Sequence, residues 1–271
     1  MKFRNVVIVT KPKQPEVARV ADELAQWLKT KNVAASLVNG ETRPPSADLV
    51  VVVGGDGTLL AAARLLGDLQ VPIVAINYGS LGFLTEVTLH EMYPALERVL
   101  AGEFVTQLRM MVDVRVVRRG KTEAKYRALN DVVINKGTLS RMIELEARVD
   151  GQYVSRFRAD GLIVSTPTGS TAYNLSAGGP IIYPTMEAMV LTPICSHTLT
   201  NRPLVLSENV QVEITLRSAQ DDVYVTVDGQ VGLNLKLDDR LVVEKSDTAL
   251  KLVAPVDKNY FDVLRGKLKW G

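Results

Sequence analysis

The stretch DLVVVVGGDGTLLAAARLL, residues 48–66, decides the fold. Its opening, DLVVVV at 48–53, is a short continuous apolar run, which is typical of a buried strand. Its closing half, 58–66, has the apolar content and length of a helix that packs against such a strand. The glycine-rich segment 54–58 joins the two. A strand that turns tightly into a helix predicts an α/β domain.

The rest of the N-terminal part repeats this alternation of strand and helix. Short apolar runs at 5–10, 33–38 and 72–76 predict further strands. The segment 17–28 carries apolar residues at helical spacing with charged residues between them, so it predicts an amphipathic helix. We therefore predict, for residues 1–101, a mostly parallel sheet with helices on its faces.

After residue 102 the apolar period changes from helical spacing to two. Apolar and polar residues alternate in four segments, at 112–116, 143–149, 210–216 and 233–237. The pairs Asp150-Gly151 and Asp228-Gly229 lie between such runs, and Asp-Gly there is a strong signal for a hairpin turn. We predict an antiparallel, sandwich-like β domain over residues 102–254. A helical tail, residues 255–271, is expected to pack back on the first domain.

The composition narrows the classes of function. The 271 residues carry 32 basic and 30 acidic side chains, a net charge of +2, and this balance disfavours nucleic acid as a partner. No apolar run is long enough for a membrane span or a signal peptide, so we expect a soluble, cytoplasmic protein. The single cysteine, Cys195, is expected to be a buried apolar residue in a reducing compartment. With only His90 and His197 present, acid–base chemistry is expected to fall to a carboxylate.

The glycine-rich segment itself predicts phosphate binding. Ligands of open α/β sheets bind at the carboxyl ends of the strands, and the unpaired N–H groups at a helix start attract phosphate. Gly55 and Gly57 allow the backbone to approach such a ligand, and Thr58 is expected to cap the helix. Asp56 would repel phosphate unless a metal ion or an acceptor hydroxyl is also present, and phosphoryl transfer supplies both. The alternative is a plain strand-to-helix turn in which Asp56 serves as a capping group.

Four further segments narrow the substrate. GGDGT is shared by NAD kinases, diacylglycerol and sphingosine kinases and, as GGDGS, by 6-phosphofructokinases. The chain also contains NYGSLGFLT at 77–85, ALNDVVIN at 128–135, RADGLIVSTPTGSTAYNLSAGGPI at 158–181 and PICSHTLTNRPLV at 193–205. Together and in this order, these segments resemble the NAD kinase family of the bacterial type that uses ATP or polyphosphate. The resemblance covers most of the chain.

The residues of these segments also permit a reading from their chemistry alone. Asn130 offers a donor and an acceptor to an amide or an adenine edge, and Asp131 accepts from ribose hydroxyls. Phe83 and Tyr173 have side chains that stack on a flat ring. Each has a plainer alternative: Asn130 and Asp131 as an irregular strand start, the two aromatic residues as core, and Asp160-Gly161 as another hairpin turn.

The resemblance to NAD kinases assigns roles residue by residue. It implies that Asp56 is the base that activates the 2′-hydroxyl of the adenosine ribose. Asp131 stands where the family has Asp or Glu, and His197 receives no role. The residues implied to bind substrate are Gly55, Gly57, Thr58, Phe83, Asn130, Asp131, Arg141, Arg158, Asp160, Thr171, Ala172, Tyr173, Asn174, Leu175, Ser176 and Gln230.

The implied reaction transfers the terminal phosphoryl group of ATP, or of polyphosphate, to NAD with a divalent cation such as Mg²⁺. Family resemblance also implies a homodimer or a homotetramer. Two other hypotheses remain at this point. A lipid kinase that shares GGDGT predicts an apolar or basic membrane-facing surface, and a sensor that binds NAD or NADP predicts tight binding without turnover.

Overall fold

The computed structural model divides into two compact units. Unit 1 comprises Met1–Leu108 and Leu250–Gly271, and unit 2 comprises Arg109–Ala249. Two long strands, β6 (Val105–Arg118) and β17 (Arg240–Ala254), begin in one unit and end in the other, so the boundaries fall inside strands. The structure describes residues 3–11, 14–39, 46–137, 141–198, 200–218, 222–254 and 258–270.

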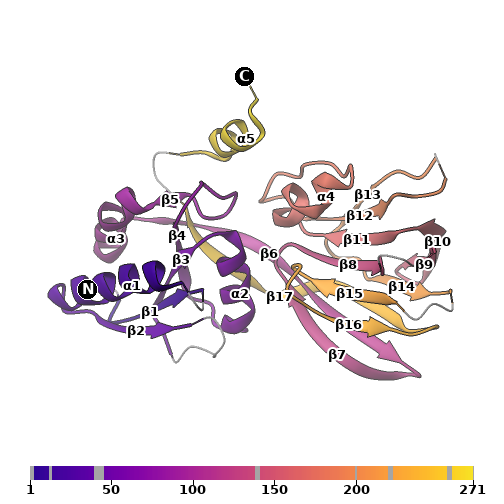
Figure 1. Cartoon of the computed structure of the whole chain (residues 1–271), viewed down its shortest axis with the longest axis horizontal. Coiled ribbons are helices and arrows are strands. Elements are labelled where there is room, and N and C mark those ends of the chain that lie inside the picture. The colour runs from indigo at the N-terminus through magenta and orange to yellow at the C-terminus, as the bar shows by residue number, and fades with distance from the viewer. Residues whose placement is uncertain are drawn as a thin grey trace. The chain divides into compact units, whose positions relative to one another are not determined.

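Unit 1 is the α/β part of the chain, and its strands pair in parallel. The order is β2-β1-β3-β4, with β5 and the last residues of β17 also pairing with β4. Figure 1 shows these strands with helices on both sides. Its elements are β1 (Asn5–Thr10), α1 (Pro15–Thr30), β2 (Ala34–Val38), β3 (Leu49–Gly54), α2 (Asp56–Leu66), β4 (Pro72–Asn77), β5 (Val87–Thr88), the 3₁₀ turn η1 (Leu89–Glu91), α3 (Met92–Ala101) and α5 (Tyr260–Leu268).

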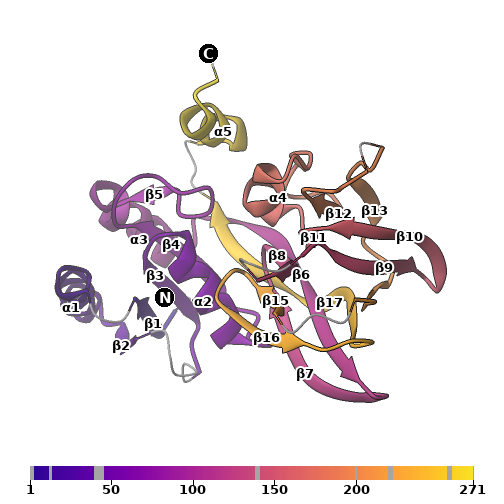
Figure 2. The same cartoon turned by 45° about the vertical axis from the view of Figure 1, so that its right-hand side comes forward.

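The parallel sheet of unit 1 is buried because helices cover both of its faces. Every residue of β3 is buried, as expected for a central strand with helices on both sides. Helices α1 and α3 pack with alternate residues of β1, β3 and β4 into one apolar cluster. Helix α2 lies on the other side of the sheet (Figures 1 and 2). This confirms the predicted α/β fold.

Unit 2 contains two sheets, and β7 to β16 pair with their neighbours in an antiparallel manner. One sheet has the order β10-β9-β14-β17, with β6 beside β17 and β7 beside β6; the other has the order β13-β12-β11-β8-β15-β16. The remaining elements are β7 (Lys121–Ala128), β8 (Asp131–Lys136), β9 (Ile143–Val149), β10 (Gln152–Ala159), β11 (Gly161–Ser165), the 3₁₀ turn η2 (Thr168–Thr171), α4 (Tyr173–Ser176), β12 (Ala188–Ile194), β13 (Leu204–Ser207), β14 (Val212–Leu216), β15 (Val223–Val227) and β16 (Val231–Leu235).

The two sheets of unit 2 share one apolar core, which confirms the predicted sandwich. Side chains from both sheets, such as Val114 and Leu145 from one and Ile134 and Leu191 from the other, belong to a single buried cluster. Figure 2 shows the two sheets, with α4 following β11. The alternation of apolar and polar residues arises because successive side chains of a strand point to opposite faces.

Two Asp-Gly pairs form the hairpin turns that the sequence predicts. Asp150-Gly151 joins β9 to β10 and Asp228-Gly229 joins β15 to β16, each with positive φ at both residues, as predicted. Asp160-Gly161 is not a hairpin turn, because β10 and β11 belong to different sheets. The expectation for Cys195 is wrong. It is exposed, with φ of 46°, because the chain turns directly after β12.

Among the described residues, no helix combines the length and apolar character that crossing a bilayer requires.

Candidate active site

The glycine-rich segment lies at the carboxyl end of β3, where it leads into α2. The helix begins at Asp56 with Gly55 as N-cap, so the prediction that Thr58 caps it is wrong. Thr58 is buried instead, and a Cβ on Gly54 would lie 2.4 Å from its Oγ1. Gly54 is therefore needed for close packing and not for an unusual φ. The backbone N–H groups at the start of α2 are the phosphate-binding feature that the sequence predicts.

The carboxylate of Asp56 is held by the segment that follows β4. It accepts hydrogen bonds from the backbone N–H groups of Phe83 (2.8 Å), Leu84 (3.2 Å) and Thr85 (3.0 Å). The hydroxyl of Thr85 donates a fourth hydrogen bond, at 2.9 Å. A Cβ on Gly82 would lie 2.0 Å from Asp56 Oδ1, so only glycine fits there. Asp56 remains half-buried.

The fold explains this arrangement. β3 and β4 are parallel neighbours, and Gly54 pairs with Asn77 at their carboxyl ends. The residues after each strand therefore meet at one edge of the sheet. Of the residues predicted to bind substrate, the structure brings Phe83 to Asp56, and the Lys267 ammonium lies 5.7 Å from the centre of the Phe83 ring. Sequence reasoning missed the contribution of Thr85, although its hydroxyl in NYGSLGFLT was a visible signal.

A second group of predicted residues lies in unit 2, at the start of β8. The carboxylate of Asp228 accepts hydrogen bonds from the backbone N–H groups of Leu129 (3.2 Å), Asn130 (2.8 Å) and Asp131 (3.3 Å). Asp131 is buried, and burial together with the nearby charge of Asp228 raises its pKa to about 7. Asp228 was predicted only as a turn residue, and its role as an acceptor has no signal in the sequence.

The segment after β11 packs directly against Asn130. The backbone N–H of Thr166 donates to the Asn130 carbonyl at 2.9 Å, and a Cβ on Gly169 would lie 2.0 Å from that carbonyl oxygen. Two buried side-chain atoms here, Asn130 Oδ1 and Thr168 Oγ1, have no hydrogen-bond partner within the described part of the chain. Unpaired buried polar atoms are costly, so these two mark a place suited to a polar ligand.

Within this segment the predicted binding residues differ in exposure. Asn174 is fully buried, and its amide donates to the carbonyls of Ser170 and Pro180 and accepts from the Thr192 hydroxyl. Its side chain therefore holds the segment in shape. Tyr173 is 39% exposed, so it is not a core residue. Of the others in the run, Thr171, Ala172 and Leu175 are half-buried and Ser176 is exposed.

The remaining predicted residues divide between the two ends of β8. Gln230 is exposed and follows the Asp228 turn, at the Asp131 end. Asp160 lies at the other end, where its carboxylate is 3.4 Å from the Lys136 ammonium. Five residue steps at about 3.3 Å each separate Asp131 from Lys136, a distance of about 17 Å.

Arg158 and Arg141 belong to the Asp160 end. Arg158 is exposed on β10 and lies 3.7 Å from Glu144, and its backbone carbonyl accepts from the N–H of His197. Arg141 is exposed, two residues before the start of β9. The structure thus places the predicted residues of unit 2 in two groups and does not bring the groups together.

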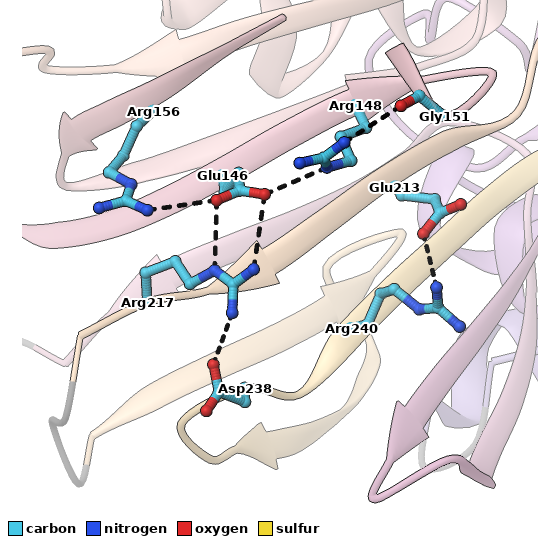
Figure 3. A network of polar contacts seen from close by, with 8 residues as sticks. All are labelled: Glu146, Arg148, Gly151, Arg156, Glu213, Arg217, Asp238 and Arg240. Atoms are coloured by element: carbon cyan, nitrogen blue, oxygen red, sulfur yellow. Dashed lines mark hydrogen bonds and ion pairs between the residues drawn. The ribbon is translucent and has the colours of Figure 1, made fainter. Parts of the chain in front are cut away.

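A third polar cluster lies on the face of a unit 2 sheet that points away from the shared core. Figure 3 shows Arg148, Arg156 and Arg217 converging on the carboxylate of Glu146, with donor–acceptor distances of 3.1 to 3.4 Å. Hydrogen bonds from Arg217 and Arg156 hold the pKa of Glu146 down at about 2. Arg217 also pairs with Asp238 at 2.7 Å.

The cluster borders a groove of about 1030 Å³ lined by charged side chains of both signs. A carboxylate that three cations neutralise is a poor base, so this cluster ties strands together and is not a site of proton transfer.

Comparison with known proteins gives one consistent result. Residues 40–104 match the ATP-NAD kinase N-terminal domain, and residues 129–254 match the ATP-NAD kinase C-terminal domain. The chain is 50% identical to the NAD kinase of Geotalea daltonii and 49% identical to that of Geobacter sulfurreducens, with 99% of each chain covered in both cases.

Solved structures agree. The chain is similar to yeast NADH kinase complexed with NADH, with a TM-score of 0.91 at 25% identity over 100% of this chain and 88% of that one. It is also similar to an NAD kinase from Archaeoglobus fulgidus in complex with ATP, with a TM-score of 0.80 at 28% identity over 98% of this chain and 100% of that one.

Unit 1 fixes the Asp56 carboxylate beside a glycine-rich segment at the start of a helix, and unit 2 places the polar groups around Asn130 on a β-sandwich. This combination is that of an enzyme that transfers phosphoryl groups. The chain belongs to the ATP-NAD kinase family. Its activity is the ATP-dependent phosphorylation of NAD.

Proposed function

We propose that Asp56 is the general base of this reaction and that the acceptor is the 2′-hydroxyl of the adenosine ribose. The ribose oxygen attacks the terminal phosphorus of ATP, the bond to the leaving ADP oxygen breaks, and the hydroxyl proton passes to Asp56. The products are ADP and NADP⁺. The observation that carries this proposal is the half-buried Asp56 carboxylate, fixed by four hydrogen bonds at the carboxyl end of β3.

The donor phosphates are proposed to lie at the start of α2. The backbone at Gly55 leaves room for a ligand, because a Cβ there would meet no atom within 4 Å, and Gly57 beside it is exposed. The dipole of α2 and its first N–H groups favour the negative charge of phosphate. These groups recognise phosphate and not the base, so inorganic polyphosphate is a second donor that the same cradle fits.

A magnesium ion is proposed to enter with the nucleotide. Mg²⁺ usually binds through substrate phosphates with one or two carboxylates and keeps several waters. Three of the donors to Asp56 occupy Oδ1, and Oδ2 is proposed to face the acceptor hydroxyl, so the ion would be held by the phosphates of ATP and by water. The ion would neutralise the charge of the polyphosphate when bound.

Unit 2 is proposed to recognise the dinucleotide through the start of β8 and the segment after β11. Asn130 Oδ1 and Thr168 Oγ1 are buried polar atoms suited to substrate groups. Asp131 is partly protonated near neutral pH, so it can donate to a ribose oxygen as well as accept from a hydroxyl. Tyr173 offers an exposed ring for stacking.

We further propose a cytoplasmic homodimer or homotetramer in which Arg158 and Asp160 complete the site of a neighbouring subunit. The support is the distance of about 17 Å between the two ends of β8. Two inactive variants, Asp56→Asn and Asp160→Asn, then complement each other when mixed. Random reassociation of dimers leaves one intact site in half of them, so about a quarter of wild-type activity is expected. Absence of any recovery, with mixed dimers detected by mass, would contradict shared sites.

The test of the whole proposal is direct. The purified chain is incubated with Mg-ATP and NAD⁺, and the products are separated by chromatography. NADP⁺ with phosphate on the adenosine 2′ position, identified by ³¹P NMR, is expected. A well-folded chain that makes no NADP⁺ would overturn the activity, and phosphate on another hydroxyl would overturn the proposed acceptor.

A further inference from the structure

The two oxygens of the Asp56 carboxylate have different surroundings. Oδ1 accepts from three donors: the backbone N–H groups of Leu84 and Thr85 and the hydroxyl of Thr85. Oδ2 accepts from the N–H of Phe83 alone. Each carboxylate oxygen has about two lone-pair positions, so Oδ1 is saturated and Oδ2 has room for one more proton donor.

The direction of the hydrogen bond from Thr85 is fixed by a second residue. Nδ2 of Asn77 lies 2.7 Å from Oγ1 of Thr85, and it also lies 3.0 Å from the carbonyl oxygen of Ser80. An amide nitrogen only donates, and a carbonyl oxygen only accepts, so the orientation of the Asn77 amide is determined. The Thr85 hydroxyl accepts from Asn77 and therefore points its own proton at Asp56 Oδ1, 2.9 Å away.

Water has little access to this chain of hydrogen bonds. Thr85 is 0% exposed and Asn77 is 3% exposed, whereas Asp56 remains half-buried. The fold holds Asn77 in place because it is the last residue of β4, in register with Gly54 on β3. Buried hydrogen bonds of this kind fix geometry more firmly than exposed ones, since water does not compete for the donors.

We propose that Thr85, oriented by Asn77, is a positioning residue for phosphoryl transfer. The pair saturates Oδ1 and so leaves Oδ2 as the carboxylate oxygen that takes the proton of the acceptor hydroxyl. This inference rests on the proposed role of Asp56 as base. Neither Thr85 nor Asn77 touches the substrate in this scheme, so their effect is on the rate of the chemical step and not on the binding of NAD.

Three variants of the full chain test the proposal. Thr85→Val removes the hydroxyl and keeps the shape, Thr85→Ser keeps the hydroxyl, and Thr85→Ala removes the hydroxyl without crowding. We expect Thr85→Val and Thr85→Ala to lower kcat by about 10- to 100-fold, which is the scale of effect for a misplaced catalytic group. KM for NAD should stay within about twofold in all three variants, and Thr85→Ser should recover most of the wild-type kcat.

The outcomes separate this inference from the proposed function. A kcat of Thr85→Val and Thr85→Ala close to that of the wild type would overturn the role of Thr85 alone. So would an equal loss in Thr85→Ser, or a loss confined to KM. If the wild type makes no NADP⁺, or if Asp56→Asn keeps full activity, the proposed function fails first. In an Asp56→Asn background, Thr85→Val should add little further loss, because both changes act through the same carboxylate.

Discussion

Asp56 in unit 1 and Asp228 in unit 2 are built in the same way and differ in their neighbours. Each carboxylate accepts hydrogen bonds from three consecutive backbone N–H groups. Those of Asp56 come from the segment after β4, and those of Asp228 come from the start of β8. Asp56 is half-buried, with a neutral hydroxyl as its fourth donor. Asp228 is buried beside a second carboxylate, Asp131, whose pKa it helps to raise to about 7.

The donors around a carboxylate can be neutral or charged, and the two kinds have different effects on it. Backbone N–H groups and hydroxyls fix the position of a carboxylate through hydrogen bonds, whereas a neighbouring cation also neutralises its charge. Glu146 shows the opposite case, because three arginines neutralise it and hold its pKa at about 2. Of these three carboxylates, Asp56 is the one that is partly exposed, so a substrate hydroxyl can reach it, whereas Asp228 is buried and shapes the Asn130 segment.

The largest expected effect separates the two similar carboxylates. Asp56→Asn should lower kcat by about 10²- to 10⁴-fold, the usual loss on removing a general base, with the Kd for NAD nearly unchanged. Asp228→Asn removes charge-assisted hydrogen bonds from the segment around Asn130, so it should raise KM for NAD by roughly tenfold. Steady-state kinetics and calorimetric titration with NAD measure both. Equal effects of the two variants on kcat would break the distinction.

The buried Asp131 carboxyl should make the free energy of unfolding depend on pH. Its pKa is about 7 in the folded chain, against an ordinary value of 3.8 for an aspartate, so between these pH values the folded state holds a proton that the unfolded state has lost. The free energy of unfolding should therefore be largest below about pH 4 for this group and should fall as the pH rises to about 7. The loss is on the order of 4 kcal/mol at 1.36 kcal/mol per pKa unit.

Asp131→Asn carries no titrating proton at this position. Denaturant unfolding between pH 4 and 8 should therefore show a flatter profile for the variant than for the wild type. The variant should also be the more stable of the two at pH 8. Parallel profiles for both proteins would show that burial beside Asp228 does not govern the Asp131 proton.

Glycines beside the two carboxylate segments give a matched pair of tests. A Cβ on Gly82 would lie 2.0 Å from Asp56 Oδ1, and a Cβ on Gly169 would lie 2.0 Å from the Asn130 carbonyl oxygen. Gly82→Ala should lower kcat by about 100-fold, since it displaces the base. Gly169→Ala should instead raise KM for NAD. Gly266→Ala is the control, because its Cβ would meet no atom within 4 Å, and it should leave both constants unchanged.

The sequence predicted the reacting groups better than the contacts that hold them. Both domain types followed from apolar periods of 3.6 and 2, because burial imposes those periods directly. Asp56 could be predicted as a reacting group because it is a carboxylate within a glycine-rich segment. Its partners could not, since backbone N–H groups carry no side-chain signal. The same holds for Asp228. The Asp-Gly pair predicted its turn, but nothing in the sequence predicted that its carboxylate accepts hydrogen bonds from the Asn130 segment.

The sequence also could not predict which of the binding residues in unit 2 lie close together. Asp160 and Thr171 stand close together in the chain, yet β11 runs between them and sends them to opposite ends of β8. Asn174 was predicted among the binding residues, and its amide is engaged within the protein. Only the three-dimensional path of the chain shows which polar groups are already paired.

The smallest effect concerns Glu146, the carboxylate held by cations. Its pKa of about 2 lies below the ordinary value of 4.5 for a glutamate, so the stabilisation by the arginines is present above about pH 4.5 and is lost as the pH falls through about 2. Glu146→Gln should lower the free energy of unfolding at pH 7 by about 1 kcal/mol, because the arginines are partly exposed and screened by solvent. Raising the salt concentration should shrink the difference.

Activity provides the contrast with Asp56. Because Glu146 exchanges no proton with substrate in our proposal, Glu146→Gln should keep the wild-type kcat and KM for NAD while its denaturation midpoint falls. A large loss of kcat with unchanged stability would mean that the arginine cluster serves the reaction. In that case charge neutralisation would no longer distinguish a structural carboxylate from a catalytic one in this chain.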